Sequence, residues 1–134
     1  MKIEHVAIWT SRLEILRDFY CRFFNGISNE RYNNPAKNFN SYFISFEQGA
    51  RLEIMSRPDI PENLNDPVSQ YKGVIHFAFE VRTMEEVDKL AHKFIEAGVP
   101  LLSGPRKTGD GYYEFEIFDP DRNRIEVGTI YRAG

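Results

Sequence analysis

The amino-acid sequence predicts an α+β fold, built from two tandem βαβββ modules that form a curved mixed sheet with helices on its outer face. Three observations lead to this fold class. A helical pattern recurs later in the chain, strand-like runs surround each copy, and a connector with three prolines separates the copies. We expect one domain, with module one at residues 1–57, the connector at 58–72 and module two at 73–134.

Each module contains one amphipathic helix whose apolar residues follow the i, i+3, i+4, i+7, i+8 spacing. Each apolar position of the first helix recurs 71 residues later in the second, and the two sets are Leu16, Phe19, Tyr20, Phe23, Phe24 and Val87, Leu90, Ala91, Phe94, Ile95. Capping boxes predict the helix starts, with Ser11 and Glu14 in module one and Thr83 and Glu86 in module two. Asn25-Gly26 and Ala97-Gly98 predict the ends, with glycine in the left-handed cap.

Strands are predicted on both sides of each helix, separated by turn residues. In module one we expect strands at 3–9, 28–32, 41–46 and 51–57, and in module two at 74–81, 100–102, 112–118 and 124–130. Residues 103–112 contain three glycines, and they are interpreted as a loop, either a mobile lid or an ordinary hairpin connection. In the last hairpin we expect Asn123 to take the left-handed turn position.

Alternation along the strands places one histidine and one glutamate of each module on the same sheet face. His5 and Glu53 oppose the apolar Val6, Ile8, Leu52 and Ile54, and in module two His76 and Glu126 oppose Phe77, Phe79, Ile125 and Val127. Because the apolar sets should pack on the helices, the four polar side chains should lie on the open, concave face.

Convergent carboxylates in a partly enclosed cup require a cation, because an unpaired buried charge costs several kcal/mol. Neutral imidazoles do not supply that charge, whereas a divalent metal ion satisfies all four groups. Imidazole and carboxylate donors suit zinc, nickel, cobalt, iron or manganese. The alternative is a set of cross-strand ion pairs on a wet face, because Arg51 and Arg57 share the face of Glu53 and Arg124 shares that of Glu126.

The motifs "IEHVAI", "ARLEIM", "GVIHFAFEV" and "FDPDRNRIEV" resemble the vicinal oxygen chelate superfamily over nearly the whole chain, with small glyoxalase I-like proteins as the nearest pattern. The resemblance implies that His5, Glu53, His76 and Glu126 are metal ligands, with Glu126 as the catalytic base and Glu53 as its counterpart. It implies a metal-dependent lyase or isomerase that stabilises an enediolate during proton transfer in a small substrate. It also implies a homodimer, in which the partner chain completes the site in some members.

Two of the departures from the glyoxalase I pattern concern glutathione. Trp9 and Arg57 stand where those enzymes have residues for glutathione, which argues against that cofactor. Trp9 could stack on a planar group, and Arg57 could pair with a carboxylate or phosphate. Arg106 and Lys107 in the glycine-containing loop could meet an anionic substrate. The alternatives to the lyase are an extradiol-type dioxygenase, thiol transfer to an antibiotic epoxide, and a drug-binding protein of bleomycin-resistance type.

Composition limits the classes of partner. The net charge of −3 lacks the basic signature of nucleic-acid binders, and no apolar run approaches the length of a membrane helix. The N-terminus does not resemble a signal peptide, so we expect a cytoplasmic protein without nucleic-acid or membrane partners. Cys21 is the single cysteine and is expected to be a buried apolar residue.

Overall fold

The computed structural model describes residues 1–131, and it confirms the α+β class with one helix in each half of the chain. The chain divides into two compact units, residues 1–64 and 65–134, with the boundary inside the predicted connector. Residues 132–134 of the expected second module lie outside the described part. The predicted joining of the two sheets stays a prediction.

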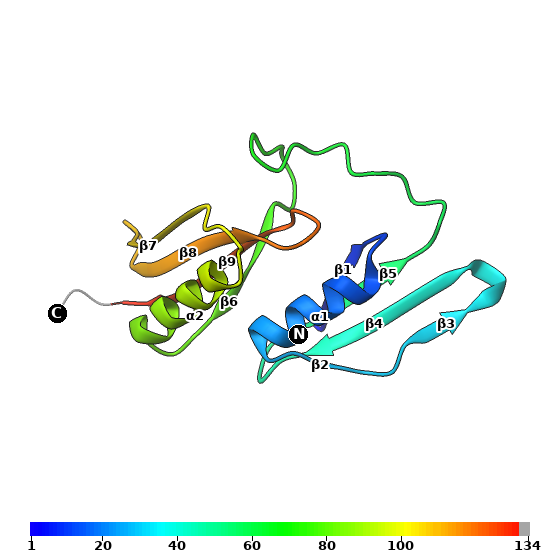
Figure 1. Ribbon diagram of the computed structural model, residues 1–134, viewed down its shortest axis with the longest axis horizontal. Helices are drawn as coiled ribbons and strands as arrows, with labels where there is room; N and C mark the ends of the chain where they lie inside the picture. Colours follow the sequence, from blue (N-terminus) through cyan, green and yellow to red (C-terminus); the bar gives the residue numbers. More distant parts are fainter. Residues whose placement is uncertain (132–134) are drawn as a thin grey trace. The chain divides into compact units, whose positions relative to one another are not determined.

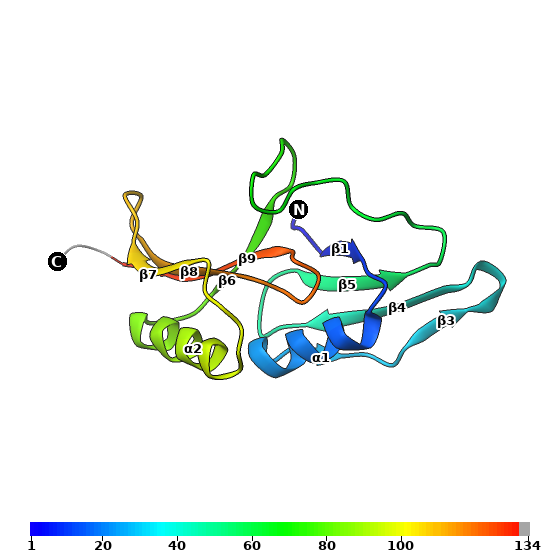
Figure 2. The same ribbon diagram turned by 45° about the horizontal axis from the view of Figure 1, so that its top comes forward.

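Module one forms a mixed sheet covered by one helix (Figure 1). Its strand order is β1-β5-β4-β2, with β3 also paired to β4, and only β1 and β5 run parallel. Figure 2 shows the extended hairpin of β3 and β4, closed by a short 3₁₀ helix. The elements are β1 His5–Trp9, α1 Leu13–Phe24, β2 Ile27–Ser28, β3 Tyr32–Asn34, the 3₁₀ helix Pro35–Lys37, β4 Phe39–Ser45 and β5 Arg51–Ser56.

Module two repeats this plan in a four-stranded sheet. Its strand order is β6-β9-β8-β7, with β6 parallel to β9 and antiparallel pairing elsewhere. The elements are β6 His76–Glu80, α2 Met84–Glu96, β7 Ser103–Lys107, β8 Tyr112–Phe118 and β9 Arg124–Ile130. The first and last strands of each module are therefore parallel neighbours, which brings their side chains into register.

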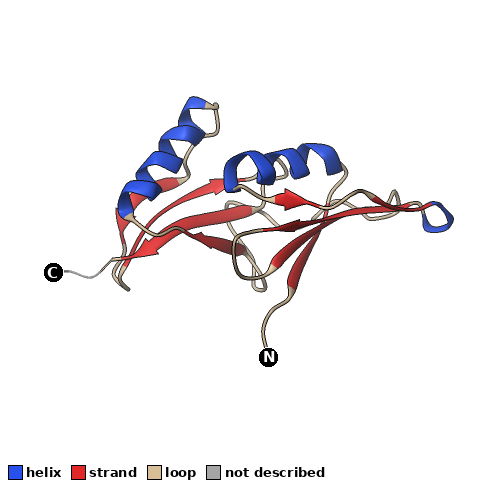
Figure 3. Cartoon of the chain, turned by 90° about the horizontal axis from the view of Figure 1, so that it is seen from below, coloured by secondary structure: helices blue, strands red, loops and turns tan. Residues whose placement is uncertain are grey.

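Each helix packs on one face of its own sheet, as Figure 3 shows. In module one the core joins Leu16, Tyr20 and Phe23 of α1 to Leu52 and Ile54 of β5. In module two, α2 and its sheet bury a matching set, which consists of Val87, Ala91, Phe94, Phe115, Ile117, Ile125 and Val127. These residues confirm the predicted apolar faces of α1 and of both last strands. They confirm most of the predicted face of α2, but Ile95, which was expected on that face, is exposed. The opposite face of each sheet is free of its own helix.

The helix starts differ between the modules. In α2 the backbone N–H of Glu86 donates to Thr83 Oγ1 at 3.1 Å, which confirms the predicted cap. The Glu86 carboxylate accepts from the backbone N–H of Arg82 at 2.7 Å. In α1 the predicted cap is wrong, because the helix begins at Leu13 with Arg12 as the N-cap residue. Ser11 therefore lies one residue too early to serve as the cap.

The helix ends also differ. Gly98 has a φ of 81° and confirms the predicted left-handed glycine after α2. After α1 the left-handed residue is Asn25, with a φ of 54°, so the assignment to Gly26 is wrong. Gly26 serves close packing instead, because a Cβ there would lie 2.5 Å from the side chain of Ile44.

Several predicted connections need correction. The expected strand at 100–102 lies later, at Ser103–Lys107, where the chain pairs with β8, so most of the predicted glycine-containing loop is a strand. Only a short turn follows before β8 begins at Tyr112. In the last hairpin Arg122 takes the left-handed position, with a φ of 65°. Asn123 is held by Asp119, which accepts from its backbone N–H at 2.9 Å and from its side-chain Nδ2 at 2.8 Å.

The remaining differences are small. β1 begins at His5 and β6 at His76, each two residues later than predicted, and the strand expected at 28–32 is split into β2 and β3. Cys21 is half-buried on α1. Among the described residues, no helix is both long and apolar enough to cross a membrane.

Candidate functional site

The histidine and glutamate of module one lie together on the sheet face away from α1. Glu53 is paired in register with Ala7, two residues after His5 on the parallel strand β1. This register places His5 Nε2 3.8 Å from Glu53 Oε1. The Glu53 side chain is only 17% exposed and that of His5 is 42% exposed, so the pair opens to solvent from the imidazole side.

A carboxylate and a guanidinium hold the other side of the His5 ring. The Glu4 carboxylate is hydrogen-bonded to His5 Nδ1, and Arg51 Nε donates to Glu4 Oε1 at 2.7 Å. The Arg51 guanidinium lies over the Phe43 ring at 4.1 Å, and His5 meets the same ring edge-on at 5.4 Å. The hydrogen bond to His5, helped by Arg51, lowers the pKa of Glu4.

Module two contains the corresponding pair. Glu126 is in register with Ala78, two residues after His76 on the parallel strand β6. His76 Nε2 lies 3.3 Å from Glu126 Oε2, and the Glu126 side chain is 19% exposed. Each module therefore brings its predicted histidine and glutamate together from its first and last strands.

Further carboxylates surround Glu126. Glu116 lies directly opposite it on β8, and Arg124 Nη1 pairs with Glu116 Oε2 at 3.0 Å. Burial is the main cause that raises the pKa of Glu126, and the charges of Glu114 and Glu116 and a hydrogen bond with Glu116 add to it. The positive charge of His76 acts in the opposite direction but does not outweigh them. Glu126 therefore binds a proton more readily than an ordinary surface glutamate.

The spacing within each pair fits a shared metal ion. Two donors about 2.1 Å from one ion lie about 3.0 Å apart at a right angle and about 3.4 Å apart at the tetrahedral angle. The observed nitrogen-to-oxygen separations, 3.3 Å in module two and 3.8 Å in module one, need little adjustment to reach these values. Imidazole and carboxylate are also suitable donors for the divalent transition metals.

Each module supplies two donors. Within the described residues, no group of three or more His, Cys, Asp or Glu side chains is placed so that it could hold a metal ion. The two pairs belong to different compact units. The convergence of all four side chains on one ion therefore remains a prediction.

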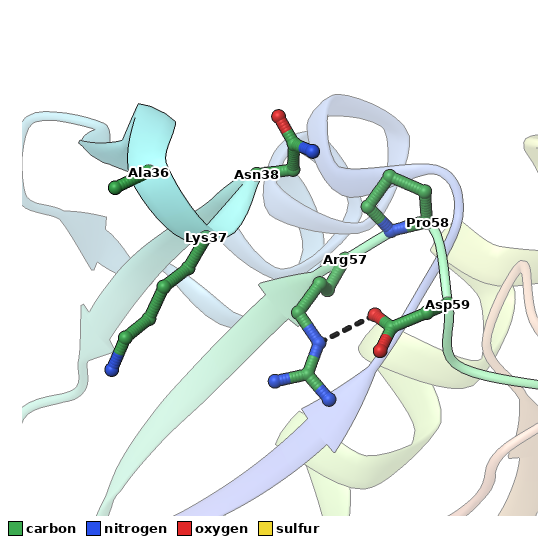
Figure 4. Close-up of a pocket in the computed structure, with 6 residues that line it drawn as sticks. All are labelled: Ala36, Lys37, Asn38, Arg57, Pro58 and Asp59. Atoms are coloured by element: carbon green, nitrogen blue, oxygen red, sulfur yellow. Dashed lines mark hydrogen bonds and ion pairs between the residues drawn. The ribbon is translucent and has the colours of Figure 1, made fainter.

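Trp9 and Arg57 lie together in module one. The Arg57 guanidinium is 5.4 Å from the centre of the Trp9 ring, and Trp9 meets Phe39 edge-to-face at 6.1 Å. Arg57 Nε also pairs with Asp59 Oδ1 at 2.5 Å (Figure 4). This ion pair borders an open pocket of about 410 Å³, lined by Ala36, Lys37, Asn38, Arg57, Pro58 and Asp59.

Arg106 and Lys107 belong to β7 and lie at its C-terminal end. Arg106 is opposite Glu114 on β8, where its charge counteracts the raised pKa that burial gives that carboxyl group. The Lys107 ammonium lies over the Tyr131 ring at 4.6 Å. Both cations are therefore anchored within module two by a strand and not carried by a loop.

Sequence reasoning missed Glu4 and Glu116. The alternation of β8 provided a signal for Glu116, which lies on the face opposite the buried Phe115 and Ile117. Glu4 had no such signal, because alternation places neighbours on opposite faces. It precedes β1, and its side chain turns toward the ring of His5.

The family model of the Glyoxalase/Bleomycin resistance protein/Dioxygenase superfamily matches residues 2–127. The chain belongs to this superfamily. The match includes all four candidate metal ligands, so the resemblance inferred from the strand motifs is confirmed.

Individual relatives are more distant. The chain is 29% identical over 131 residues to biphenyl-2,3-diol 1,2-dioxygenase 2 of Rhodococcus globerulus. The aligned region covers 94% of this chain but only 61% of that protein. A glyoxylase/bleomycin resistance protein/dioxygenase domain from Frankia sp. EAN1pec has a TM-score of 0.80 at 16% identity, covering 97% of this chain and 98% of the other. Lactoylglutathione lyase from Agrobacterium tumefaciens has a TM-score of 0.68 at 22% identity, covering 95% and 92%. These two structures support the fold.

Proposed function

We propose that this protein is a metal-dependent lyase or isomerase of glyoxalase type that acts on a small substrate with adjacent oxygen atoms. His5, Glu53, His76 and Glu126 would hold one divalent ion, either zinc, nickel, cobalt, manganese or iron. When bound, the ion supplies Lewis-acid stabilisation of negative charge on a substrate oxygen.

One observation carries the proposal. The same imidazole–carboxylate pair occurs at matching strand positions in both modules, with 3.8 Å between donors in one and 3.3 Å in the other. Ion pairing alone explains one such contact, but it does not explain why both carboxylates are more than four-fifths buried beside an imidazole. A charged carboxylate in that environment requires a cation, and both pairs have donors suited to the same class of metal.

Glu126 is the proposed base. Its raised pKa, caused mainly by burial, suits a carboxylate that accepts a proton from a carbon next to a carbonyl group. Glu116 lies within hydrogen-bonding contact of it and favours its protonated form, both through that hydrogen bond and through its own negative charge. Glu53 is the proposed counterpart, because it occupies the matching position in module one.

Four side chains are proposed to contact the substrate. Trp9 is 40% exposed and offers a ring for a planar or apolar group. Arg57 stacks on that ring, and Arg106 and Lys107 offer cations at the end of β7. Because Trp9 and Arg57 do not match the glutathione-binding residues of glyoxalase I, we expect a substrate other than the hemithioacetal of glutathione.

Metal content tests the proposal. The protein is purified without added metal, loaded with zinc, cobalt, nickel, manganese or ferrous iron, and desalted before elemental analysis. We expect about one ion per chain in the wild type and a clear loss in Glu126→Gln and His76→Ala. Glu96→Gln is the matched control, because Glu96 pairs with His92 on the exposed surface of α2. A wild type that retains no metal would contradict the proposal and favour a drug-binding protein.

The similarity to the Rhodococcus dioxygenase supports a second candidate, ring cleavage of a catechol on ferrous iron. That chemistry typically uses two histidines and one carboxylate with open positions on the metal. The fourth donor, Glu53, argues against it. Oxygen uptake by the iron-loaded protein with a catechol would favour this second candidate, whereas proton exchange at a carbon next to a carbonyl without oxygen uptake would favour the lyase.

We also propose a homodimer. Light scattering on the purified chain, which has a mass of 15.7 kDa, would give about twice that value for a dimer.

A further inference from the structure

Each ring nitrogen of His5 lies beside a different carboxylate, and one of the two is hydrogen-bonded. Nδ1 is hydrogen-bonded to Glu4 Oε2, while Nε2 faces Glu53 Oε1 at 3.8 Å. An ionised carboxylate can only accept a hydrogen bond, so the proton of a neutral imidazole must sit on Nδ1. The Nε2 atom then carries a lone pair on the side of Glu53.

Glu4 is itself fixed in place. Its two carboxylate oxygens have separate partners, because Oε1 binds Arg51 and Oε2 binds His5. The backbone of Arg51 also donates to the Glu4 carbonyl oxygen at 2.9 Å, and its guanidinium lies on the Phe43 ring. Although the Glu4 side chain is half-exposed, these contacts restrict it to few rotamers.

Arg51 connects this arrangement to the second donor. It stands two residues before Glu53 on β5, so both side chains project from the same face of one strand. The strand that carries the Glu53 oxygen therefore also carries the group that orients His5. A shift of β5 would move both together.

Module two has the corresponding arginine but uses it differently. Arg124 stands two residues before Glu126, as Arg51 does before Glu53. The residue before His76 is Ile75, so the imidazole has no neighbouring carboxylate of that kind. Arg124 instead pairs with Glu116 at 3.0 Å, and Glu116 is in contact with Glu126. In module one the carboxylate that the arginine binds is hydrogen-bonded to the histidine. In module two the carboxylate that the arginine binds is in contact with the glutamate.

We propose that Glu4, braced by Arg51, is a positioning residue that keeps the His5 proton on Nδ1 and presents the Nε2 lone pair beside Glu53. This inference rests on the proposed function only for the role of the lone pair, which would bind the metal ion. Histidine ligands commonly donate their second N–H to such a carboxylate, and loss of that partner typically lowers metal affinity about 10- to 100-fold.

Nuclear magnetic resonance of the imidazole nitrogens tests the positioning role without metal. The chain has only three histidines, so ¹⁵N-labelled protein at a pH where all are neutral gives few signals to assign. In wild type we expect His5 in the Nδ1–H form. In Glu4→Ala we expect a shift toward the Nε2–H form, with His76 unchanged. Glu96→Ala is the matched control and should alter His92 alone, because Glu96 pairs with His92 at 3.0 Å.

Metal affinity, measured by competition with a chelator, gives the second readout. Glu4→Ala should bind zinc about 10- to 100-fold more weakly than wild type, and Glu4→Gln, which keeps an acceptor oxygen, should lie between them. Circular dichroism verifies that the variants are folded. An unchanged His5 tautomer in folded Glu4→Ala would overturn the inference. Wild type in the Nδ1–H form without stoichiometric metal would refute the proposed function and leave the positioning role standing.

Discussion

Replacing Glu126 by glutamine should stabilise the metal-free protein at neutral pH. The change removes one negative charge from a largely buried side chain opposite Glu116 and leaves the side-chain volume nearly unchanged. Burial, Glu114 and Glu116 raise the pKa of Glu126 against the attraction of His76, so the ionised carboxylate opposes folding. The loss of the His76 contact should therefore be outweighed by the relief of burial and repulsion.

The expected gain is about 1 kcal/mol, the upper end of the range for the interaction of two side chains directly across two strands. For a chain of this length, that is about 3–5 °C in melting temperature. Because the folded pKa is raised, the stabilising contribution of the neutral form is full below the ordinary pKa of about 4.3 and declines as pH rises. The difference between Glu126→Gln and wild type should therefore appear at pH 7 and vanish near pH 4.

Differential scanning calorimetry with a chelator present measures the effect at both pH values. Addition of zinc at about 100 times its dissociation constant should then stabilise wild type by about 2.7 kcal/mol. The variant should gain less, so the order of stability should reverse. Glu96→Gln, on the exposed face of α2, should follow wild type throughout. A metal-free variant that is less stable than wild type at pH 7 would refute the reasoning, because His76 would then be the stronger influence.

Three further predictions concern the fold. Thr83→Ala should destabilise the protein by about 1 kcal/mol in urea unfolding through loss of the α2 cap, whereas Ser11→Ala should change stability by less than about 0.5 kcal/mol; equal losses would contradict the assignment of the caps. Gly104→Ala should destabilise by more than about 2 kcal/mol, since its φ is 80° and a Cβ would lie 2.4 Å from a backbone oxygen of β8; a neutral effect in thermal unfolding would show that β7 can shift. The Tyr42 hydroxyl donates to Glu14 at 2.8 Å, and burial followed by this carboxylate raises the pKa of Tyr42. The stability that this tyrosine contributes is full below its ordinary pKa of about 10 and is lost above it, so the cost of Tyr42→Phe, about 1–3 kcal/mol at pH 7, should shrink on titration above pH 10.

The sequence predicted best where a strand is buried on one face. β8 and β9 were predicted with their observed bounds, because alternation against a helix leaves one register that buries Ile117 and Ile125. The two histidine–glutamate pairs follow from the same alternation. Parallel pairing of the first and last strands then sets the distance between each histidine and its glutamate.

Prediction was weakest where several residues competed for one local role. Ser11 and Thr10 both suit a helix start, and the backbone N–H of Arg12 donates to Thr10 Oγ1 at 2.9 Å. Asn25 takes the left-handed position because Gly26 is needed against Ile44. Pairing with β8 at Ser103 and beyond determined where β7 lies, and local sequence carries no information about that partner. The positions of these caps and of β7 depend on tertiary contacts, and the secondary-structure propensity of a local segment carries no information about such contacts.

Each histidine–glutamate pair forms within its own unit, and this has a consequence for assembly. Glu4 and Arg51 complete the surroundings of His5 without module two, and Glu116 and Arg124 complete those of Glu126 without module one. Each module therefore holds its own pair of donors in place through contacts made within that module. The proposed four-donor site would need one module one opposed to one module two, whether the two modules come from the same chain or from two chains. Exchange of modules between subunits would then change the oligomer without changing the chemistry.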